Sequence, residues 1–382
     1  MNRRVFIASA IAGMAAAQQS DQPEPIRKLK PMLDGVEPIA NGERAARVEK
    51  ARRLMRVHKM SAIYLESGAS MYYFIGKREP GQAWILPARG EAVWTPAEAA
   101  KAAQSLRDLG IATGTVGMEE LVRFGTYDGL RREAPAVEAV SATPVTAGCR
   151  MIKSAAEIAL LQRANDITIE AYKAALATLR EGMTQRELSA NISAAFRALG
   201  VGGAAMAIFG KYTAFPHGSV QPQQLREGDM VLIDDGCSVE GYQSDITRTT
   251  VFGKPTQRQR EVWDLERRAQ DAALAAARPG TTCESVDAAA RKVITGAGFG
   301  PGYKTPGLPH RTGHGIGLDG HEWTYLVKGN TTKIEPGMCF SDEPTIAIYG
   351  EFGVRLEDCM YITEKGARMF TKQSPAIDQP FG

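Results

Sequence analysis

The sequence predicts an α+β protein in which a small α/β domain precedes a larger domain with a pseudo-twofold internal repeat. Three observations predict this organisation. Strand-like and helical segments alternate over residues 41–149. A pair of helices recurs about 98 residues further along the chain within residues 150–375. Strand-like segments that carry carboxylates follow each copy. The 382 residues are enough for two domains.

The N-terminus has the pattern of an export signal. Arg3 and Arg4 precede an apolar stretch over residues 5–17 that ends in alanines. A charged start, an apolar run and small residues at its end are typical of a secretory signal peptide, and the paired arginines resemble the twin-arginine type. We therefore expect residues 1–17 to be a signal peptide and the protein to be periplasmic or secreted; a frayed amphipathic N-terminus is the alternative. Residues 18–40, rich in Gln, Pro and Asp, are predicted to be a tether.

Composition narrows the class of protein. Hydrophobic residues make up 44% and charged residues 23%, as in an ordinary soluble globular protein. The formal net charge of +3 gives no electrostatic reason to expect nucleic acid or an anionic membrane as partner. No apolar run reaches the roughly 18 residues that a membrane span needs. The five cysteines form no CxxC pattern, so neither a zinc knuckle nor a disulfide framework is indicated.

The first domain is expected over residues 41–149. Its predicted segments are a helix at 44–58, apolar strand-like runs at 61–65, 83–86, 91–94 and 115–118, and a helix at 97–109. It contains no group of carboxylates or histidines that could form a site. His58 stands alone and is expected to be a surface residue.

The second domain is expected over residues 150–375 and contains the repeat. Helices are predicted over 155–180 and 185–199 in the first copy and over 257–277 and 284–295 in the second. Thr184 matches Thr282 at the repeat offset, and His217 matches His314 at nearly the same offset. Chance similarity of the glycines that end these helices is the alternative. The repeat predicts a pseudo-twofold domain with a pair of metal ions on its axis.

Two aspartates of the first copy are predicted to lie on one hairpin. A tight turn centred on residues 239–240 would place Asp234 directly opposite Asp245. Directly opposed side chains lie roughly 4.5–5.5 Å apart at Cβ. Two carboxylates at that distance repel each other, and a bound cation removes the conflict. Aspartates that hydrogen-bond to the turn are the alternative, although the apolar run 230–233 that leads into Asp234 argues against it.

Histidines gather at the same motifs. His314 lies in the glycine-rich segment TGHGIG, where glycine lets the backbone approach a ligand closely. His321 follows seven residues later, and His217 and His310 lie at or beside these motifs. A lone histidine is usually structural, but this clustering favours a functional site. His310 is expected to support the ligands through hydrogen bonds from a second layer.

Two glutamates complete the predicted set. Glu343 lies on an apolar strand predicted over residues 338–348, and Glu357 lies on an alternating strand over residues 354–362 with Arg355 on the same face. A plain buried ion pair between Glu357 and Arg355 is the alternative. Oxygen ligands with a single imidazole suit Mn²⁺, Co²⁺ or Zn²⁺. We expect two divalent ions, with Mn²⁺ first and Co²⁺ or Zn²⁺ as alternatives, held by Asp234, Asp245, His314, Glu343 and Glu357.

Together these motifs resemble the pita-bread metallopeptidases. The resemblance rests on the DDG segment followed by Asp245, the histidine of TGHGIG, the second histidine seven residues later, the Glu-Pro pair and the RLED strand. Within that group the chain is most similar to Xaa-Pro aminopeptidases and prolidases, which are related to methionine aminopeptidase and creatinase. The resemblance covers residues 41–375 and implies a pita-bread catalytic domain preceded by a creatinase/prolidase-like N-terminal domain.

The resemblance also implies a role for each site residue. Asp234 would bind one metal, His314 and Glu343 the other, and Asp245 and Glu357 would bridge the two. The same resemblance implies that His217 and His321 contact the substrate or the tetrahedral intermediate and that Arg355 supports the ligands from behind.

A hydrolytic mechanism follows from this chemistry. Two divalent ions activate a water that attacks the scissile carbonyl. Glu343 is then the candidate that carries a proton to the leaving nitrogen, while His217 and His321 donate hydrogen bonds to the developing oxyanion.

The implied activity is removal of the N-terminal residue from Xaa-Pro peptides. A peptide is the expected partner and a homodimer the expected assembly. Hydrolysis of a non-peptide C–N bond, as in creatinase-like relatives, is the alternative, but the creatinase branch lacks the full metal set. A binding protein without turnover would have lost a ligand, and none is lost here. Thr345 stands where a glycine is common and the N-terminal domain is short, which leaves the length of the substrate open.

Overall fold

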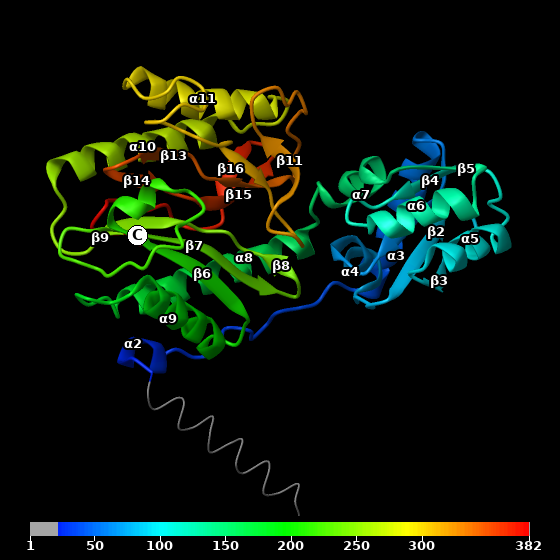
Figure 1. The fold of residues 1–382 in the computed structure, drawn as a ribbon, viewed down its shortest axis with the longest axis horizontal. Helices are drawn as coiled ribbons and strands as arrows, with labels where there is room; N and C mark the ends of the chain where they lie inside the picture. Colours follow the sequence, from blue (N-terminus) through cyan, green and yellow to red (C-terminus); the bar gives the residue numbers. More distant parts are fainter. Residues whose placement is uncertain (1–21, 382) are drawn as a thin grey trace, which may run out of the picture. The chain divides into compact units, whose positions relative to one another are not determined.

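The computed structural model describes residues 22–381 and divides the chain into two compact units (Figure 1). The smaller unit comprises residues 38–156, and the larger one comprises residues 22–37 together with 157–381. The sequence places this boundary near residue 150. In the structure α7 (Thr143–Arg150) packs on α3 (Asn41–Val57), which keeps the residues up to 156 in the smaller unit.

The smaller unit is the α/β domain that the alternation of segments predicts. Its sheet has the order β3-β2-β1-β4-β5; the β1–β2 and β2–β3 pairs are antiparallel, and the β1–β4 and β4–β5 pairs are parallel. The strands are β1 (Met60–Glu66), β2 (Gln82–Pro87), β3 (Val93–Pro96), β4 (Gly114–Met118) and β5 (Val137–Ser141). The helices are α3, α4 (Ala69–Ile75), α5 (Ala99–Asp108), α6 (Phe124–Glu133) and α7.

The core of this unit forms between the sheet and its helices. Tyr64 of β1 packs in one cluster with Ile85 of β2, Leu106 of α5 and Val116 of β4. Alternate side chains of each strand face this cluster, which is why these short apolar runs are visible in the sequence. The sequence does not predict β5, because this edge strand reads VEAVS and leaves Glu138 exposed.

The larger unit contains two helix pairs and the strands that follow each pair. The helices are α2 (Glu24–Arg27), α8 (Ala155–Leu176), α9 (Gln185–Ala198), α10 (Gln257–Ala276) and α11 (Cys283–Gly296), with a 3₁₀ turn η1 (Gly210–Ala214). The strands of the first copy are β6 (Gly203–Phe209), β7 (Met230–Val239), β8 (Tyr242–Gln243) and β9 (Arg248–Val251). Those of the second copy are β10 (Gly313–Gly315), β11 (Glu322–Leu326), β12 (Cys339–Asp342), β13 (Thr345–Ile348), β14 (Phe352–Arg355), β15 (Asp358–Thr363) and β16 (Gly366–Met369).

Three sheets result from these strands. In the first, β7 pairs with β6, β8 and β9. The second has the order β11-β10-β12-β15-β16, and β13 and β14 form a separate hairpin. Helices and strands are therefore mixed as an α+β domain, which confirms the predicted class.

Matching backbone features confirm the pseudo-twofold repeat. Thr184 and Thr282 each occupy the N-cap of the second helix of a pair. Gly182 and Gly280 precede them with φ of 78° and 83°, and each N–H donates to a carbonyl oxygen 2.8 Å away. Glycine adopts this left-handed conformation without steric cost. The two helix pairs are therefore connected in the same way.

Two pairs of strands are also equivalent. The N–H of Gly228, before β7, donates to Phe252 O just after β9, and that of Gly337, before β12, donates to Ile362 O in β15; both distances are 2.8 Å. The antiparallel pair β7–β9 therefore corresponds to the pair β12–β15. Asp234 and Glu343 occupy equivalent positions, because each follows its glycine at the same spacing.

The predicted match between His217 and His314 is wrong as a structural equivalence. His314 lies in β10, which pairs with β12, whereas His217 lies beyond β6 and η1. The connection from α11 to β10 (297–312) is longer than that from α9 to β6 (199–202). Because the two connections differ in length, the offset of about 98 residues that relates the helix pairs no longer relates equivalent positions at the histidines.

The N-terminal segment of the larger unit differs from the tether that the sequence predicts over residues 18–40. Within its described part, Ile26 of α2 is buried, and the N–H of Met32 donates to Leu199 O at 2.9 Å at the end of α9. An apolar side chain and a backbone hydrogen bond therefore hold residues 22–37 on the larger unit. The predicted signal peptide, residues 1–17, lies outside the described residues and stays a prediction.

Two further expectations concern membranes and cysteines. No helix within residues 22–381 is long and apolar enough to cross a membrane. All five cysteines are free and buried, as a sequence without a disulfide framework predicts.

Candidate metal centre

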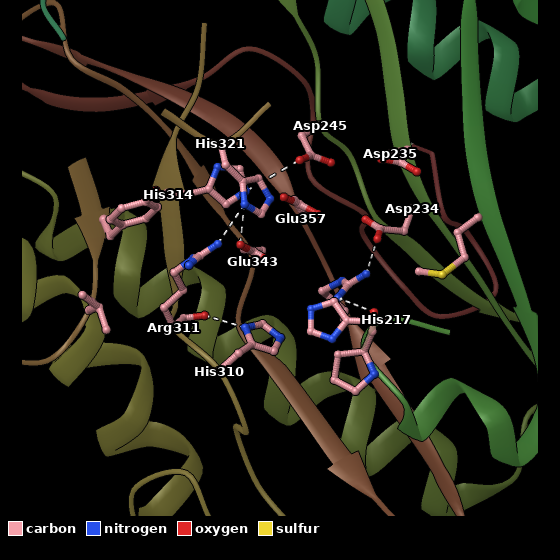
Figure 2. Close-up of a pocket in the computed structure, with 15 residues that line it drawn as sticks. His217, Asp234, Asp235, Asp245, His310, Arg311, His314, His321, Glu343 and Glu357 are labelled. Carbon is pink, nitrogen blue, oxygen red and sulfur yellow. Dashed lines mark hydrogen bonds and ion pairs between the residues drawn. The ribbon is translucent and has the colours of Figure 1, made fainter. Parts of the chain in front are cut away.

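One cavity of about 520 Å³ in the larger unit collects the predicted site residues (Figure 2). All nine line it: His217, Asp234, Asp245, His310, His314, His321, Glu343, Arg355 and Glu357. The sequence did not single out the other residues of the lining, which are Met206, Pro216, Asp235, Arg311, Tyr325 and Val327. These residues come from β7, β10 and the segments around β12 and β15, so both halves of the repeat line one cavity.

The hairpin that carries the aspartates has a different register from the predicted one. Its turn is centred on Glu240 and Gly241, which have φ of 48° and 81°, and Val239 pairs with Tyr242. A two-residue turn of this kind needs positive φ at both central positions, so it forms at the glycine. The same register pairs Ile233 with Arg248, so Asp234 faces residue 247 and not Asp245.

Asp245 nevertheless reaches the same space as Asp234. It lies two residues before the position that faces Asp234, on the same face of the hairpin, where diagonal neighbours remain within reach of each other. Oxygens of Asp234, Asp245 and Glu357 lie within 4.8 Å of one another. The prediction that Asp234 and Asp245 face each other is therefore wrong. The two carboxylates nevertheless lie close together, as the sequence predicts.

Thr247 is a site residue that the sequence reasoning missed. Its Oγ1 lies 2.5 Å from Asp234 Oδ1 and 2.6 Å from Glu357 Oε2, and it accepts a hydrogen bond from Arg355 Nε at 3.0 Å. A hydroxyl has a single hydrogen to donate, so it can serve only one of the two carboxylates at a time. The signal was its alternation with Asp245 along the strand, which puts both side chains on one face.

The two glutamates lie where predicted strands break. The run 338–348 divides into β12 and β13 around Glu343-Pro344, and the run 354–362 divides into β14 and β15 around Glu357. Proline lacks the N–H that a continuous ladder needs. Asp342 pairs with Asp358 and Thr345 with Arg355, so the positions between them, Glu343 and Glu357, face each other.

Two opposed carboxylates without a cation would destabilise this arrangement. Glu357 is 1% exposed and Glu343 is 9% exposed. Among the described residues, Glu357 Oε1 is buried without a hydrogen-bond partner. A buried charged oxygen in that state is costly, and metal coordination is one way to satisfy it. The donor set therefore fits bound cations.

His314 presents one defined nitrogen to the carboxylates. Its Nδ1 lies 3.0 Å from Gly315 O, so Nδ1 carries the proton and donates it to that carbonyl. Nε2 is left as a bare lone pair, 3.3 Å from Glu343 Oε1 and 3.6 Å from Asp245 Oδ2. Desolvation, followed by the neighbouring His321, lowers the pKa of His314 to about 3, so the ring stays neutral. A neutral imidazole with a fixed tautomer is the form that binds a metal.

The carboxylates of the site are removed from water and repel one another. Desolvation is the largest cause that raises the pKa of Glu343 to about 7, and Asp234 adds to it. Desolvation followed by neighbouring carboxylates raises the pKa of Asp245 and of Glu357 well above the usual range. Positive charge placed among these groups would return them to their ionised forms.

The separate ligand atoms form overlapping groups. Asp234, Asp245 and Glu357 make one group, and His314, Glu343 and Glu357 make another; within each group the ligand atoms lie within 4.8 Å of one another. Glu357 belongs to both. A third group combines Asp245, His314 and His321, whose ring centroid lies 3.8 Å from that of His314.

Arg355 supports this cluster from behind. Its Nη2 donates to Asp234 Oδ2, and its Nη1 donates to Pro216 O at 3.1 Å, next to His217. Burial lowers the pKa of Arg355, but Asp234 and Glu357 outweigh this effect and raise it. The guanidinium therefore stays charged and connects a predicted ligand to the loop that carries a predicted substrate contact.

Two more histidines have assigned hydrogen bonds. His310 Nδ1 lies 2.6 Å from Arg311 O and donates to it, while Nε2 accepts from Thr345 Oγ1 at 2.9 Å. Arg311 Nη2 donates to His321 Nδ1 at 2.9 Å. A neutral His321 therefore carries its proton on Nε2. Desolvation, then Arg311, lowers the pKa of His321, which keeps the ring neutral.

Comparison with known proteins gives matches over both units. The family model for Metallopeptidase family M24 matches residues 159–364, and that for the Creatinase/Prolidase N-terminal domain matches residues 47–105. An Xaa-Pro dipeptidase of Pyrococcus furiosus is 30% identical over 344 residues, which cover 85% of this chain and 97% of that protein. A probable dipeptidase PepE of Mycobacterium tuberculosis is 40% identical over 238 residues, 62% of each chain.

Solved structures show the same likeness. A prolidase from Thermococcus sibiricus has a TM-score of 0.81 at 25% identity, covering 88% of this chain and 98% of that one. A dipeptidase PepE from Mycobacterium ulcerans has a TM-score of 0.79 at 31% identity, covering 88% and 97%. These likenesses confirm the expected pita-bread architecture.

Proposed function

The chain belongs to metallopeptidase family M24, and we propose that it removes the N-terminal residue from Xaa-Pro substrates at a centre of two divalent ions, with dipeptides cleaved best. The observation that carries the proposal is Glu357, which is shared by the group with Asp234 and Asp245 and the group with His314 and Glu343. A shared carboxylate is what a pair of adjacent ions needs. Relatives described as Xaa-Pro dipeptidases support the substrate class.

The donor set favours particular metals. Carboxylate oxygens with one imidazole suit Mn²⁺ first, with Co²⁺ or Zn²⁺ as alternatives. When bound, such ions supply an activated water and polarise the scissile carbonyl. In this proposal Asp234 serves one ion, His314 and Glu343 serve the other, and Asp245 and Glu357 serve both.

The remaining steps belong to side chains of this chain. Glu343 lines the cavity and can carry a proton from the attacking water to the leaving nitrogen. His321 has its proton on Nε2, because Arg311 occupies Nδ1, and can therefore donate to an oxyanion. His217 lines the same cavity, and the bond from Arg355 to Pro216 O holds its loop.

Arg311 supports the preference for dipeptides. Its guanidinium lies 4.7 Å from the centroid of the Tyr325 ring, and no carboxylate of residues 22–381 forms an ion pair with it. The cavity therefore contains a guanidinium that forms no ion pair with a carboxylate of the described residues. In an Xaa-Pro dipeptide the proline carboxylate lies directly beyond the scissile bond, and arginine recognises carboxylates through paired N–H donors.

A matched set of substrates tests the proposal. With Mn²⁺ restored, we expect Ala-Pro to be cleaved faster than Ala-Pro-Gly, and Ala-Ala and N-acetyl-Ala-Pro to resist cleavage. A chelator should abolish turnover. Arg311→Met should reduce the preference for Ala-Pro over Ala-Pro-Gly, whereas Arg311→Lys should retain part of it. Equal cleavage of Ala-Ala would contradict the preference for proline, and no cleavage of any member with metal restored would favour the hydrolysis of a non-peptide C–N bond instead.

A further inference from the structure

A second cavity of about 380 Å³ adjoins the metal centre. Asp235, Asp245 and His321 line both spaces, so the second cavity begins beside the predicted ligands. The rest of its lining comes from β6, β7, β8 and the loop before His321 and consists of small or uncharged residues, among them Ser238 and Gln243. Arg311 lines the main cavity only, so the cation and the second cavity belong to different parts of the site.

Glycines keep this second cavity open. A Cβ built on Gly320 would make one ordinary contact, with Gln243 Oε1 at 3.4 Å, so that position has room for a methyl group. A Cβ on Gly203 would lie 2.6 Å from the Phe196 ring, so the packing of β6 on α9 excludes a side chain there. The walls are therefore backbone and short side chains, and the protein itself does not fill the space between them.

Asp235 lines this space as a second carboxylate beside the predicted ligand Asp245. It is exposed in the cavity, lies on the same side of the centre as Asp234 and Asp245 (Figure 2), and belongs to none of the three ligand groups. No lysine or arginine of residues 22–381 forms an ion pair with it, and none lines the second cavity. Tyr172 Oη donates to its backbone carbonyl at 2.9 Å, and its φ of 122° is rare for a residue with a side chain. The Asp235 side chain accepts a hydrogen bond from the backbone of Met206 but forms no ion pair within residues 22–381.

We propose that the second cavity receives the side chain of the substrate's N-terminal residue and that Asp235 selects lysine or arginine there; this inference rests on the proposed function. In this proposal the scissile carbonyl lies at the metal centre and the Cα of that residue lies beside Asp245 and His321, the residues that line both cavities. The methylenes of a long basic side chain can lie along the small, uncharged lining while its charged end reaches Asp235. Arg311 and Asp235 then bind opposite charges of one dipeptide.

Lys-Pro and norleucine-Pro provide the direct test, because norleucine has the straight chain of lysine without the ammonium group. We expect the wild-type enzyme to favour Lys-Pro in kcat/KM by about fivefold, the effect of a partly exposed ion pair. Asp235→Asn should bring the ratio close to one. The ratio is the readout because any general effect on the neighbouring centre cancels in it.

Gly320→Val tests the location of the side chain independently of charge. It should lower kcat/KM for both long substrates relative to Gly-Pro, because the added methyl groups enter the second cavity. A wild-type ratio of one with norleucine-Pro cleaved would overturn this inference and leave the proposed function intact. Equal losses of kcat/KM for Lys-Pro, norleucine-Pro and Gly-Pro in Asp235→Asn would also overturn it. Asp235 would then act on the dipeptide backbone or the proline, which all three substrates share. Failure to cleave any Xaa-Pro dipeptide would overturn the proposed function itself, and the inference with it.

Discussion

Two equivalent pairs of strands build this site in different ways. In the β12–β15 pair the facing positions hold two carboxylates, Glu343 and Glu357. In the β7–β9 pair the same positions hold Asp234 and Thr247, and the second carboxylate, Asp245, comes from a diagonal position on the hairpin. A symmetric backbone therefore carries an asymmetric set of side chains.

The difference shows what the hydroxyl contributes. Thr247 contacts Asp234 from its own half and Glu357 from the other half, and it accepts a hydrogen bond from Arg355. A carboxylate at that position would add negative charge to a site that already contains four carboxylates, those of the two groups that share Glu357. The hydroxyl instead lies within hydrogen-bond distance of one carboxylate from each half, donates to one of them at a time, and adds no charge.

The largest expected effect is that of removing the diagonal carboxylate. Asp245→Ala should lower turnover by more than about 100-fold, because even residues that only support metal ligands contribute 10–100-fold. Bound metal should fall well below the wild-type stoichiometry, with little change in circular dichroism. Asp378→Ala, which removes a surface ion pair with Arg260, is the matched control. Wild-type turnover by a metal-depleted Asp245→Ala enzyme would refute the assignment.

The neighbouring histidines His314 and His321 should differ from each other. His314→Ala should lose metal, because its Nε2 faces the carboxylates. His321→Ala should keep its metal and lose about 10²–10³ in kcat, the effect of one oxyanion donor. Metal analysis beside steady-state kinetics separates the two roles. The alternative is the group of Asp245, His314 and His321; equal loss of metal in both variants would support it.

Thr247→Val tests the asymmetry directly. It preserves the shape of the side chain and removes the hydroxyl that joins the two halves, so we expect a loss of about 10–100-fold in turnover or metal affinity. Thr247→Ser retains the hydroxyl and should stay close to wild type. If valine and serine behaved alike, the hydroxyl would have no part in holding the carboxylates.

The smallest effect concerns the stability of the metal-free protein. Folding raises the pKa of Glu343 from 4.5 to about 7, so the folded state binds its proton more tightly than the unfolded state does. This contribution is present in full below pH 4.5 and is lost as the pH rises through 7. We expect the Tm of metal-free protein to fall between pH 5 and pH 8 and Mn²⁺ to restore it most at pH 8. A Tm that stayed level over this range without metal would contradict the prediction.

The sequence predicts the chemistry of the site better than its geometry. His314, Glu343 and Glu357 stand in distinctive local motifs, and residue type alone indicates what each can bind. The register of the hairpin depends on whether the turn uses residues 239–240 or 240–241, a choice set by the backbone angle at Gly241. With the turn at 239–240 the residue predicted to face Asp234 is Asp245, whereas with the observed turn it is Thr247.

The sequence also could not predict that the strands break at Glu343 and Glu357. Apolar and alternating patterns extend through Glu343 and Glu357, so they predict continuous strands, but the chain passes from one sheet to another at both residues. Arg311 and Asp235 have no local motif at all. Neither forms an ion pair within residues 22–381, and only the assembled cavity shows this.

Metal stoichiometry measured together with turnover tests the central claim most directly. Metal-free protein would be titrated with Mn²⁺ while bound ions per chain and cleavage of Ala-Pro are followed in the same samples. A pair of ions that share Glu357 predicts two bound ions per chain at full activity, and one ion per chain in Glu357→Gln with turnover lost. Full activity at a single ion per chain, or in protein that holds none, would contradict the account.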